Sequence, residues 1–182
     1  MHGIIFNELQ RYARARLGEQ GWDKLLKEAG LSKRLYLAVK SYPDEEAVAM
    51  VMAATRLTGL TARAILEDFG EFIAPNLMRS YKAVIQPDWT VLDLVEHVER
   101  IHDRVRNDPH ATPPRLVCKR VDANTVQVSY VSKRQLCGVG IGFIRGIGNE
   151  MKQPVEVREL QCMHQGAPSC EFEVRRLAST AT

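Results

Sequence analysis

The sequence carries little excess charge of either sign. Its 182 residues include 25 lysines and arginines against 22 aspartates and glutamates, which gives a formal net charge of +3. Arg11, Arg14 and Arg16 form a small basic cluster, which is typical of a solvated helix face. Nucleic-acid binding usually requires a strongly basic patch or stripe. We therefore expect no nucleic-acid partner.

Long apolar runs are also missing. The longest, at residues 47–54, is far shorter than the roughly 20 residues that cross a bilayer. The apolar run at residues 4–6 is too short for the core of a signal peptide. We therefore expect no membrane association and a cytoplasmic location. In that compartment the four cysteines are expected to be thiols or metal ligands rather than disulfides.

Helical spacing of apolar residues marks the first two thirds of the chain. Glycines, prolines and acidic first turns set the boundaries between these segments. The pattern predicts helices at about residues 4–17, 22–29, 43–57 and 61–72, a further piece that begins or is kinked at Pro75, and a long helix at about residues 90–107, which Asp108 and Pro109 end.

The last third of the chain changes character. Residues 116–121 and 125–131 are rich in β-branched side chains and flank a short polar turn, which predicts a hairpin. The glycine-laced stretch at residues 134–151 predicts a helix packed closely on a neighbour, since each glycine costs a helix roughly 1 kcal/mol. Two last strands are predicted at about residues 155–162 and 169–175.

The two patterns together indicate the fold class. Helices first and antiparallel strands after are typical of an α+β protein. The chain is 45% hydrophobic and 26% charged, as in ordinary globular domains, and it is long enough to bury both a core and a flat cofactor. We expect one domain at residues 1–182, with the helical N-terminal part packed on a C-terminal antiparallel sheet of about four strands.

A valine stripe on the long helix contains a histidine. Val91, Val95, Val98, His102 and Val105 recur at 3.6 residues per turn and share one helix face. A histidine on such a face is most often a core residue with one hydrogen-bond partner. Neutral imidazole also suits haem iron, because one nitrogen can bind the metal while the other meets a carbonyl. The helix pattern alone leaves both interpretations open.

Three polar residues alternate where the second strand of the hairpin ends. Tyr130, Ser132 and Arg134 are spaced so that their side chains share one face of a strand. Two hydroxyls and a guanidinium in a row suit two carboxylates on a rigid planar ligand, since arginine can hold a carboxylate bidentately. Taken by itself, the spacing favours the polar outer face of a half-exposed strand.

The segment at residues 130–134 resembles the Tyr-x-Ser-x-Arg signature of H-NOX (haem nitric oxide/oxygen binding) domains. The resemblance covers nearly the whole chain, and further pieces agree in order and spacing: the start Met-His-Gly-Ile-Ile-Phe-Asn, Trp22, Lys40-Ser41-Tyr42, Phe69-Gly70-Glu71-Phe72, Ile101-His102, and Arg134-x-Leu-Cys. It implies a haem b between the helical part and the sheet. His102 would be the iron ligand, and Tyr130, Ser132 and Arg134 would bind the haem propionates.

The resemblance also implies how the haem is distorted. In this family a proline after the histidine-bearing helix presses on the ring. Pro113 and Pro114 stand in that region, and Pro114 is our choice. The alternative is that both prolines simply form the connection from helix to strand.

The resemblance also implies which gas is bound, through the residue at position 139. Oxygen-binding family members carry a tyrosine five residues after the signature arginine, where this chain has Val139. By approximate alignment, Leu9 and Ala74 replace the tryptophan and asparagine that support that tyrosine. The resemblance thus implies a sensor that binds NO, can bind CO and excludes O2, because bound O2 needs a hydrogen-bond donor. A tyrosine reaching the iron from elsewhere, Tyr12 or Tyr81, would undo this expectation.

The implied mechanism is a switch rather than turnover. NO weakens the bond opposite to itself, so His102 detaches, the haem relaxes against Pro114, and the helix that carries His102 shifts. We expect no output domain in this chain, so the partner is a separate protein, a histidine kinase or a cyclic-di-GMP enzyme. No arrangement of nucleophile, base and oxyanion donors suggests an enzyme.

The cysteines predict a second site near the C-terminus. Some H-NOX proteins resemble this region and carry zinc on cysteines that match Cys137, Cys162 and Cys170. His164 is our choice for the fourth ligand, with Cys118 and Glu159 as alternatives, since thiolates, imidazole and carboxylates all bind zinc. Unpaired thiols remain the other interpretation. Without zinc they could be oxidised and serve as a redox input.

One rival family shares the end of the sequence. The pattern Arg158-Glu159-x-x-Cys162, Gly166 and Cys170-x-Phe172 also resembles 4-vinyl-reductase-like domains, which bind small hydrophobic molecules without haem. Such a module needs neither His102 nor the signature at residues 130–134. A third hypothesis, a catalytic zinc enzyme, would require an open metal position.

Overall fold

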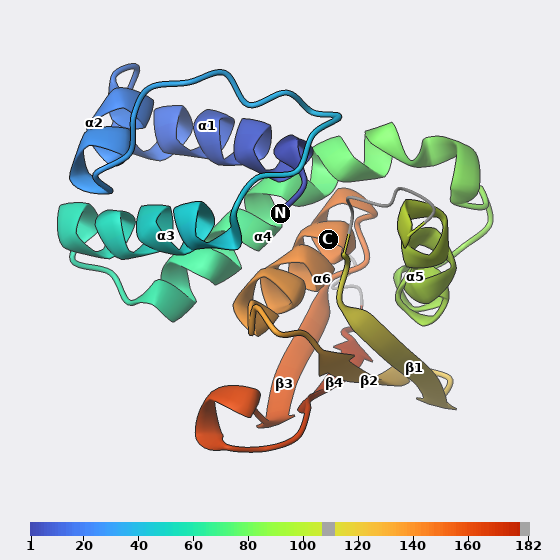
Figure 1. Cartoon of the computed structure of the whole chain (residues 1–182). Helices are drawn as coiled ribbons and strands as arrows, with labels where there is room; N and C mark the ends of the chain where they lie inside the picture. The colour runs from blue at the N-terminus through green and yellow to red at the C-terminus, as the bar shows by residue number, and fades with distance from the viewer. Residues whose placement is uncertain (107–111, 179–182) are drawn as a thin grey trace.

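The computed structural model describes residues 1–106 and 112–178, apart from the side chains of Arg104 and Val105. Figure 1 shows helices on one side of the molecule and a sheet on the other, which confirms the predicted α+β fold. The helices are α1 (Gly3–Leu17), α2 (Gly21–Glu28), α3 (Asp44–Thr58), α4 (Ala62–Ser80), α5 (Val91–Arg106) and α6 (Cys137–Glu150). The strands are β1 (Arg115–Asp122), β2 (Thr125–Val131), β3 (Val155–Gln161) and β4 (Cys170–Arg176).

The strands form one antiparallel sheet in the order β1-β2-β4-β3. Tyr130 on β2 lies opposite Leu116 on β1 and Cys170 on β4. From Val126 on, the even-numbered residues of β2 are buried, while the odd-numbered residues are half-buried or exposed. One face of the sheet therefore belongs to the core, as period-2 alternation predicts.

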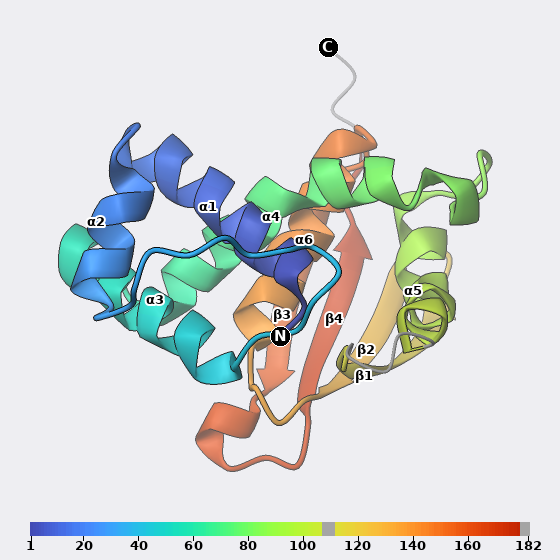
Figure 2. The same ribbon diagram turned by 45° about the horizontal axis from the view of Figure 1, so that its top comes forward.

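Two hydrophobic cores meet along α4. Phe6, Trp22 and Met50 belong to a core built by α1–α4, and Phe172 belongs to a second core built by the sheet, α5 and α6. Figures 1 and 2 show α1, α2 and α3 on one side of α4, and α6 with the strands on the other. Each large side chain buried in these cores contributes roughly 1.5–3 kcal/mol.

Helices α4 and α6 approach each other through glycines. A Cβ at Gly142 would lie 1.8 Å from the carbonyl oxygen of Glu67, and one at Gly70 would lie 2.3 Å from that of Val139. Real Cβ atoms cannot come this close to backbone, so no larger residue fits without separating the helices. The glycine-laced helix therefore packs closely on a neighbour, as predicted, and the neighbour is α4.

Two element boundaries differ from the predictions. Pro75 does not begin a new helix, one of the two outcomes expected there. Helix α4 continues through it, because the buried Ile73 and Ala74 hold this part of the helix between the two cores. Helix α6 begins at Cys137 rather than at Arg134, since Gln135 has a φ of 51° and interrupts the helical backbone. The expected end of the long helix at Asn107, and the Asp108-Pro109 stop, lie outside the described residues.

The helices were also compared with the length of a membrane span. Within the described ranges, each helix taken singly is too short or too polar to cross a bilayer. Helices α3 and α4 pass such a test only as a pair, and a bend of 107° separates them.

Candidate functional site

A cavity of about 1060 Å³ lies between the helices and the sheet. It is at the upper end of the roughly 300–1,000 Å³ that small-molecule sites occupy. Its walls are mainly apolar and come from α1, α4, α5, α6 and β2, with side chains such as Leu9, Phe69, Leu77, Leu94, Phe143 and Ile144. The lining also includes polar groups that contact one another, since Arg134 bonds to Asp44 and to Ser132.

Helix α5 brings His102 to the cavity. The helix starts with a reciprocal cap, in which Asp93 Oδ2 accepts from the Thr90 backbone N–H (2.9 Å) and Thr90 Oγ1 accepts from that of Asp93 (3.3 Å). Val91 and Val95 are buried, whereas Val98 and His102 are half-buried and line the cavity. Of the predicted stripe, only the side chain of Val105 lies outside the described residues.

The imidazole of His102 is electrically suited to bind a metal. Burial lowers the pKa of His102, and Glu99 opposes that shift only in part, so the ring is neutral near pH 7. Its Nδ1 is buried, has no hydrogen-bond partner among the described residues, and lies 3.6 Å from Glu99 Oε2. A neutral imidazole beside a carboxylate is the usual state of a histidine that ligates a metal.

The carboxylate of Glu99, next to His102, also binds the segment that follows α5. Glu99 accepts from Arg106 at 2.6 Å and from the backbone N–H of Leu116 at 3.1 Å. Arg106 also donates to the carbonyl oxygen of Pro114 at 3.1 Å. Pro113 and Pro114 both line the cavity. Both prolines therefore lie at the cavity wall, and Pro114 is tied to the helix that carries His102.

The three signature residues line the same cavity. The alternation had suggested that all three side chains share one face of a strand. Strand β2 ends at Val131, so Ser132 and Arg134 instead lie in the turn after it. Ser132 Oγ accepts from the backbone N–H of Arg134 at 3.2 Å, which holds the turn. Tyr130 is only 4% exposed, and burial raises its pKa. The turn, not strand pleating, brings the three groups together.

Arg134 has two protein partners that the sequence reasoning missed. Its Nε donates to Asp44 Oδ2 at 2.7 Å, and its terminal nitrogens contact Thr112. Burial alone would raise the pKa of Asp44, but the N-terminal ammonium and Arg134 outweigh burial and hold that pKa below its usual value. The sequence signal was Asp44 after Pro43, which we interpreted only as a helix start.

The positions that govern gas selectivity are apolar in this chain. Val139 and Leu9 line the cavity, while Ala74 is fully buried in the core. Tyr12 donates its hydroxyl to Asp68 at 2.7 Å. Tyr81 lines the cavity. The residues present therefore fit a haem group, since apolar side chains, a neutral imidazole and side chains that can bind carboxylates line one cavity.

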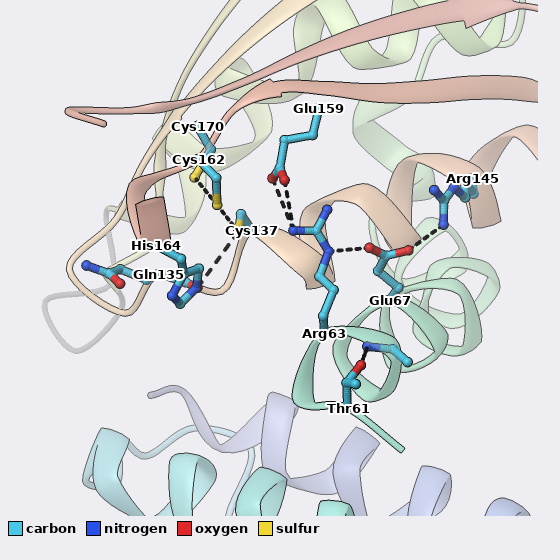
Figure 3. Close-up of polar contacts among 11 residues, drawn as sticks. Thr61, Arg63, Glu67, Gln135, Cys137, Arg145, Glu159, Cys162, His164 and Cys170 are labelled. Atoms are coloured by element: carbon cyan, nitrogen blue, oxygen red, sulfur yellow. Dashed lines mark hydrogen bonds and ion pairs between the residues drawn. The ribbon is translucent and has the colours of Figure 1, made fainter. Parts of the chain in front are cut away.

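Three buried cysteines form a second group at the start of α6 and the ends of β3 and β4 (Figure 3). Cys162 Sγ lies 3.7 Å from Cys137 Sγ and 3.7 Å from Cys170 Sγ. In a tetrahedral zinc site with Zn–S bonds near 2.3 Å, sulfur atoms are about 3.8 Å apart. The ligand atoms of these cysteines and of Glu159 all lie within 4.8 Å of one another. The spacing fits a tetrahedral metal ion.

The structure does not bring the expected fourth ligand into this group. The Nε2 atom of His164 instead lies 2.7 Å from the carbonyl oxygen of Gln135 (Figure 3), because the short 3-10 helix η2 (Met163–Gln165) carries it past the sulfurs. Cys118 stands on β1, where burial and two carboxylates of α5 raise its pKa to about 12. Glu159, the other alternative, is the residue that joins the three cysteines.

Comparisons with known proteins agree with this geometry. The sequence model of the haem-NO-binding family matches residues 2–159. An H-NOX protein from Shewanella oneidensis in the Fe(II)NO state is similar in structure, with a TM-score of 0.90 and 25% identity over 98% of this chain and 100% of that one.

Two more distant structures share the fold. An unliganded Fe(II) H-NOX protein from K. algicida has a TM-score of 0.86 and 19% identity, over 100% of both chains. An H-NOX mutant from T. tengcongensis has a TM-score of 0.86 and 20% identity, also over 100% of both. The family match extends over most of the sequence, and the chain therefore belongs to the haem-NO-binding (H-NOX) family of haem-based gas sensors.

Proposed function

We propose that this chain is a haem-based sensor of nitric oxide. His102 is the iron ligand of haem b, and Tyr130, Ser132 and Arg134 hold the propionates. The observation that carries the proposal is that His102 on α5 and these three residues, from a different part of the sequence, line one apolar cavity of about 1060 Å³. Structures of an S. oneidensis relative with NO and with CO support a diatomic ligand.

The residues around His102 provide the switch. Haem would supply an iron that binds NO, and His102 would hold that iron from α5, beside the neighbouring carboxylate of Glu99. Glu99 and Arg106 link α5 to Pro114 and Leu116, so a shift of α5 reaches the start of β1. Such a helix shift is the bistable element that signalling requires.

Selectivity for NO over O2 rests on the apolar lining of the cavity. Val139 and Leu9 offer no hydrogen-bond donor, so O2 lacks its main stabilisation whereas NO does not need one. CO binds as well but is not the signal. The signalling partner that responds to this shift is a separate cytoplasmic protein, a histidine kinase or a cyclic-di-GMP enzyme. We assign no catalytic residue to the chain.

Absorption spectra of the haem-supplied protein test the proposal. We expect a Soret band that changes with NO and with CO and is unchanged in air, and loss of that band in His102→Ala. His97→Ala is the matched control, because His97 lies on the same helix but stacks on Trp89. A colourless protein, or His102→Ala that keeps its iron–imidazole spectrum, would overturn the haem assignment and favour a haem-free module of the 4-vinyl-reductase-like type. A persistent oxy spectrum in air would overturn NO selectivity.

A second function rests on the cysteine group. We propose that Cys137, Cys162 and Cys170 hold a structural zinc ion, because their sulfurs have the spacing of a tetrahedral site. Without the ion these buried thiols are a redox-sensitive cluster. Metal analysis of purified protein is expected to give one zinc per chain, lost in Cys162→Ser. A wild-type protein that binds no zinc would overturn this assignment.

A further inference from the structure

A line of charged side chains connects the cysteine group to helix α4. Arg63 NH1 contacts both carboxylate oxygens of Glu159 at 3.1 Å. The Nε of Arg63 also contacts Glu67, whose second oxygen accepts from Arg145 at 2.6 Å. Figure 3 shows Glu159 between the sulfurs and Arg63. Its carboxylate therefore lies within reach of both a metal ion and a guanidinium.

The backbone of β3 explains why Glu159 points in this direction. The pairing of β3 with β4 shifts between Glu159 and Gln161, and such irregularities re-aim side chains. Glu159 is 21% exposed and stands close to three buried sulfurs. His164 already contacts the carbonyl oxygen of Gln135. Glu159 is therefore the better placed of the two candidate ligands.

Arg63 also supplies a compensating charge beside a metal site of this composition. A zinc ion makes its thiol ligands thiolates, so three thiolates and one carboxylate leave an excess of two negative charges. A nearby cation stabilises such an excess at a partly buried site. Arg63 is held there by two carboxylates, Glu159 and Glu67. Partners of metal ligands in this position orient the ligand and tune the affinity.

We propose that Glu159 is the fourth ligand of the zinc ion, and that Arg63 positions Glu159 and transmits the occupancy of the zinc site to helix α4. The proposal rests on the zinc site described above. It adds to that site a ligand identity and a regulatory connection to the haem cavity.

Residues next to Arg63 link the cysteine group to the wall of the cavity. Leu66 follows Arg63 by one turn of α4 and lines the cavity. Gly138, directly after Cys137, lies so close to α4 that a Cβ there would meet Leu66 Cβ at 3.0 Å and Arg63 Cδ at 3.3 Å. A change at Cys137 or Glu159 therefore meets the first turns of α4 without an intervening layer.

The ligand assignment is tested by metal affinity in the haem-containing chain. Zinc competition with a chromophoric chelator is expected to show at least a tenfold loss of affinity in Glu159→Gln and Glu159→Ala, and wild-type affinity in the matched control His164→Gln. The d–d bands of Co2+-substituted protein should change in the Glu159 variants and not in His164→Gln. Loss of affinity in His164→Gln with wild-type behaviour in both Glu159 variants would overturn the assignment.

The role of Arg63 is tested by gas kinetics. We expect Arg63→Gln to lower zinc affinity by about 10- to 100-fold, as for other partners of metal ligands, and Arg63→Lys to recover part of it. CO dissociation rates should differ between zinc-loaded and zinc-stripped wild type and become equal in Arg63→Gln. Equal rates in the two wild-type forms would overturn the connection while leaving the zinc site intact. The Soret spectrum is recorded separately, so failure of haem binding is distinguished from failure of this proposal.

Discussion

The two cores of this molecule differ in how they contribute to function. The core of α1–α4 is closed around aromatic side chains, with Phe6 stacked on Tyr36 and Trp22 beside them. The core of the sheet, α5 and α6 borders the cavity, the histidine and the cysteine group. The lesson is that the core of the first region supplies only apolar packing to part of the cavity wall, whereas the second region carries the histidine and the cysteines that we propose as metal ligands. The contacts between the two cores then decide whether a structural change in one reaches the other.

The largest effect is expected where the two regions touch through glycine. Gly142→Ala should lower the free energy of unfolding by about 3 kcal/mol, because its Cβ would lie 1.8 Å from a backbone oxygen of α4 and overpacking costs this much. The matched control is Gly140→Ala, whose Cβ meets nothing within 4 Å and which should gain up to about 1 kcal/mol. Urea denaturation measures both. Equal stability of the two variants would show that α4–α6 contact does not limit stability.

The second effect concerns the end of the cavity where the regions are joined by charge. Arg134→Ala should weaken haem retention by about 1.5–3 kcal/mol, the range for hydrogen bonds to charged groups. Asp44→Asn should have a smaller effect, since Arg134 keeps its contacts with Thr112. Haem transfer to apomyoglobin measures the loss. Retention unchanged in Arg134→Ala would remove the propionate role of this arginine.

A third test places a hydrogen-bond donor on α6, in the apolar lining of the cavity. Val139→Tyr should produce an oxy spectrum in air, since one hydrogen bond of about 0.5–1.5 kcal/mol raises O2 affinity by up to roughly tenfold. Val139→Phe adds the same ring without a hydroxyl and should stay without oxygen. Tyr81→Phe should leave the gas spectra unchanged. If wild type binds O2 and Tyr81→Phe does not, the selectivity argument fails.

The smallest effect lies inside the helical region. Asp68 has a lowered pKa, chiefly because Arg16 donates to it, with Tyr12 adding a further hydrogen bond. Its stabilisation is present above the unfolded pKa of about 3.9 and is lost as pH falls through the lower folded value. We expect less than about 1 kcal/mol, because the pair is partly exposed. Asp68→Asn should flatten this part of the curve of unfolding free energy against pH, and a curve identical to wild type would contradict the assignment.

Much of the fold followed from local patterns. The valine stripe predicted α5, the glycines predicted a close helix contact, and alternation predicted the hairpin of β1 and β2. No new helix begins at Pro75, although proline propensity allowed one, because burial of Ile73 and Ala74 in the two cores holds α4 continuous. Local preference is weak compared with packing of this extent.

The candidate site divides in the same way. The stripe that contains His102 could be interpreted because it lies on a single helix, and the segment at residues 130–134 because its three polar residues lie within five consecutive positions. The partnership of Arg134 with Asp44, 90 residues apart, has no local signal. Glu159 was only an alternative to His164, since nothing in the order of residues shows which side chain faces the sulfurs.

The sequence by itself determined the element types, the valine-lined face that carries His102 and the family to which the chain belongs. Only the tertiary structure decided that α4 runs between two cores, that Asp44 and Arg134 meet at the cavity, and that Glu159 and Arg63 stand beside three cysteines. Periodicity along a chain records which face of an element is buried. Which residue of another element a side chain contacts depends on packing and strand register. Both are set by many contacts between residues distant in sequence.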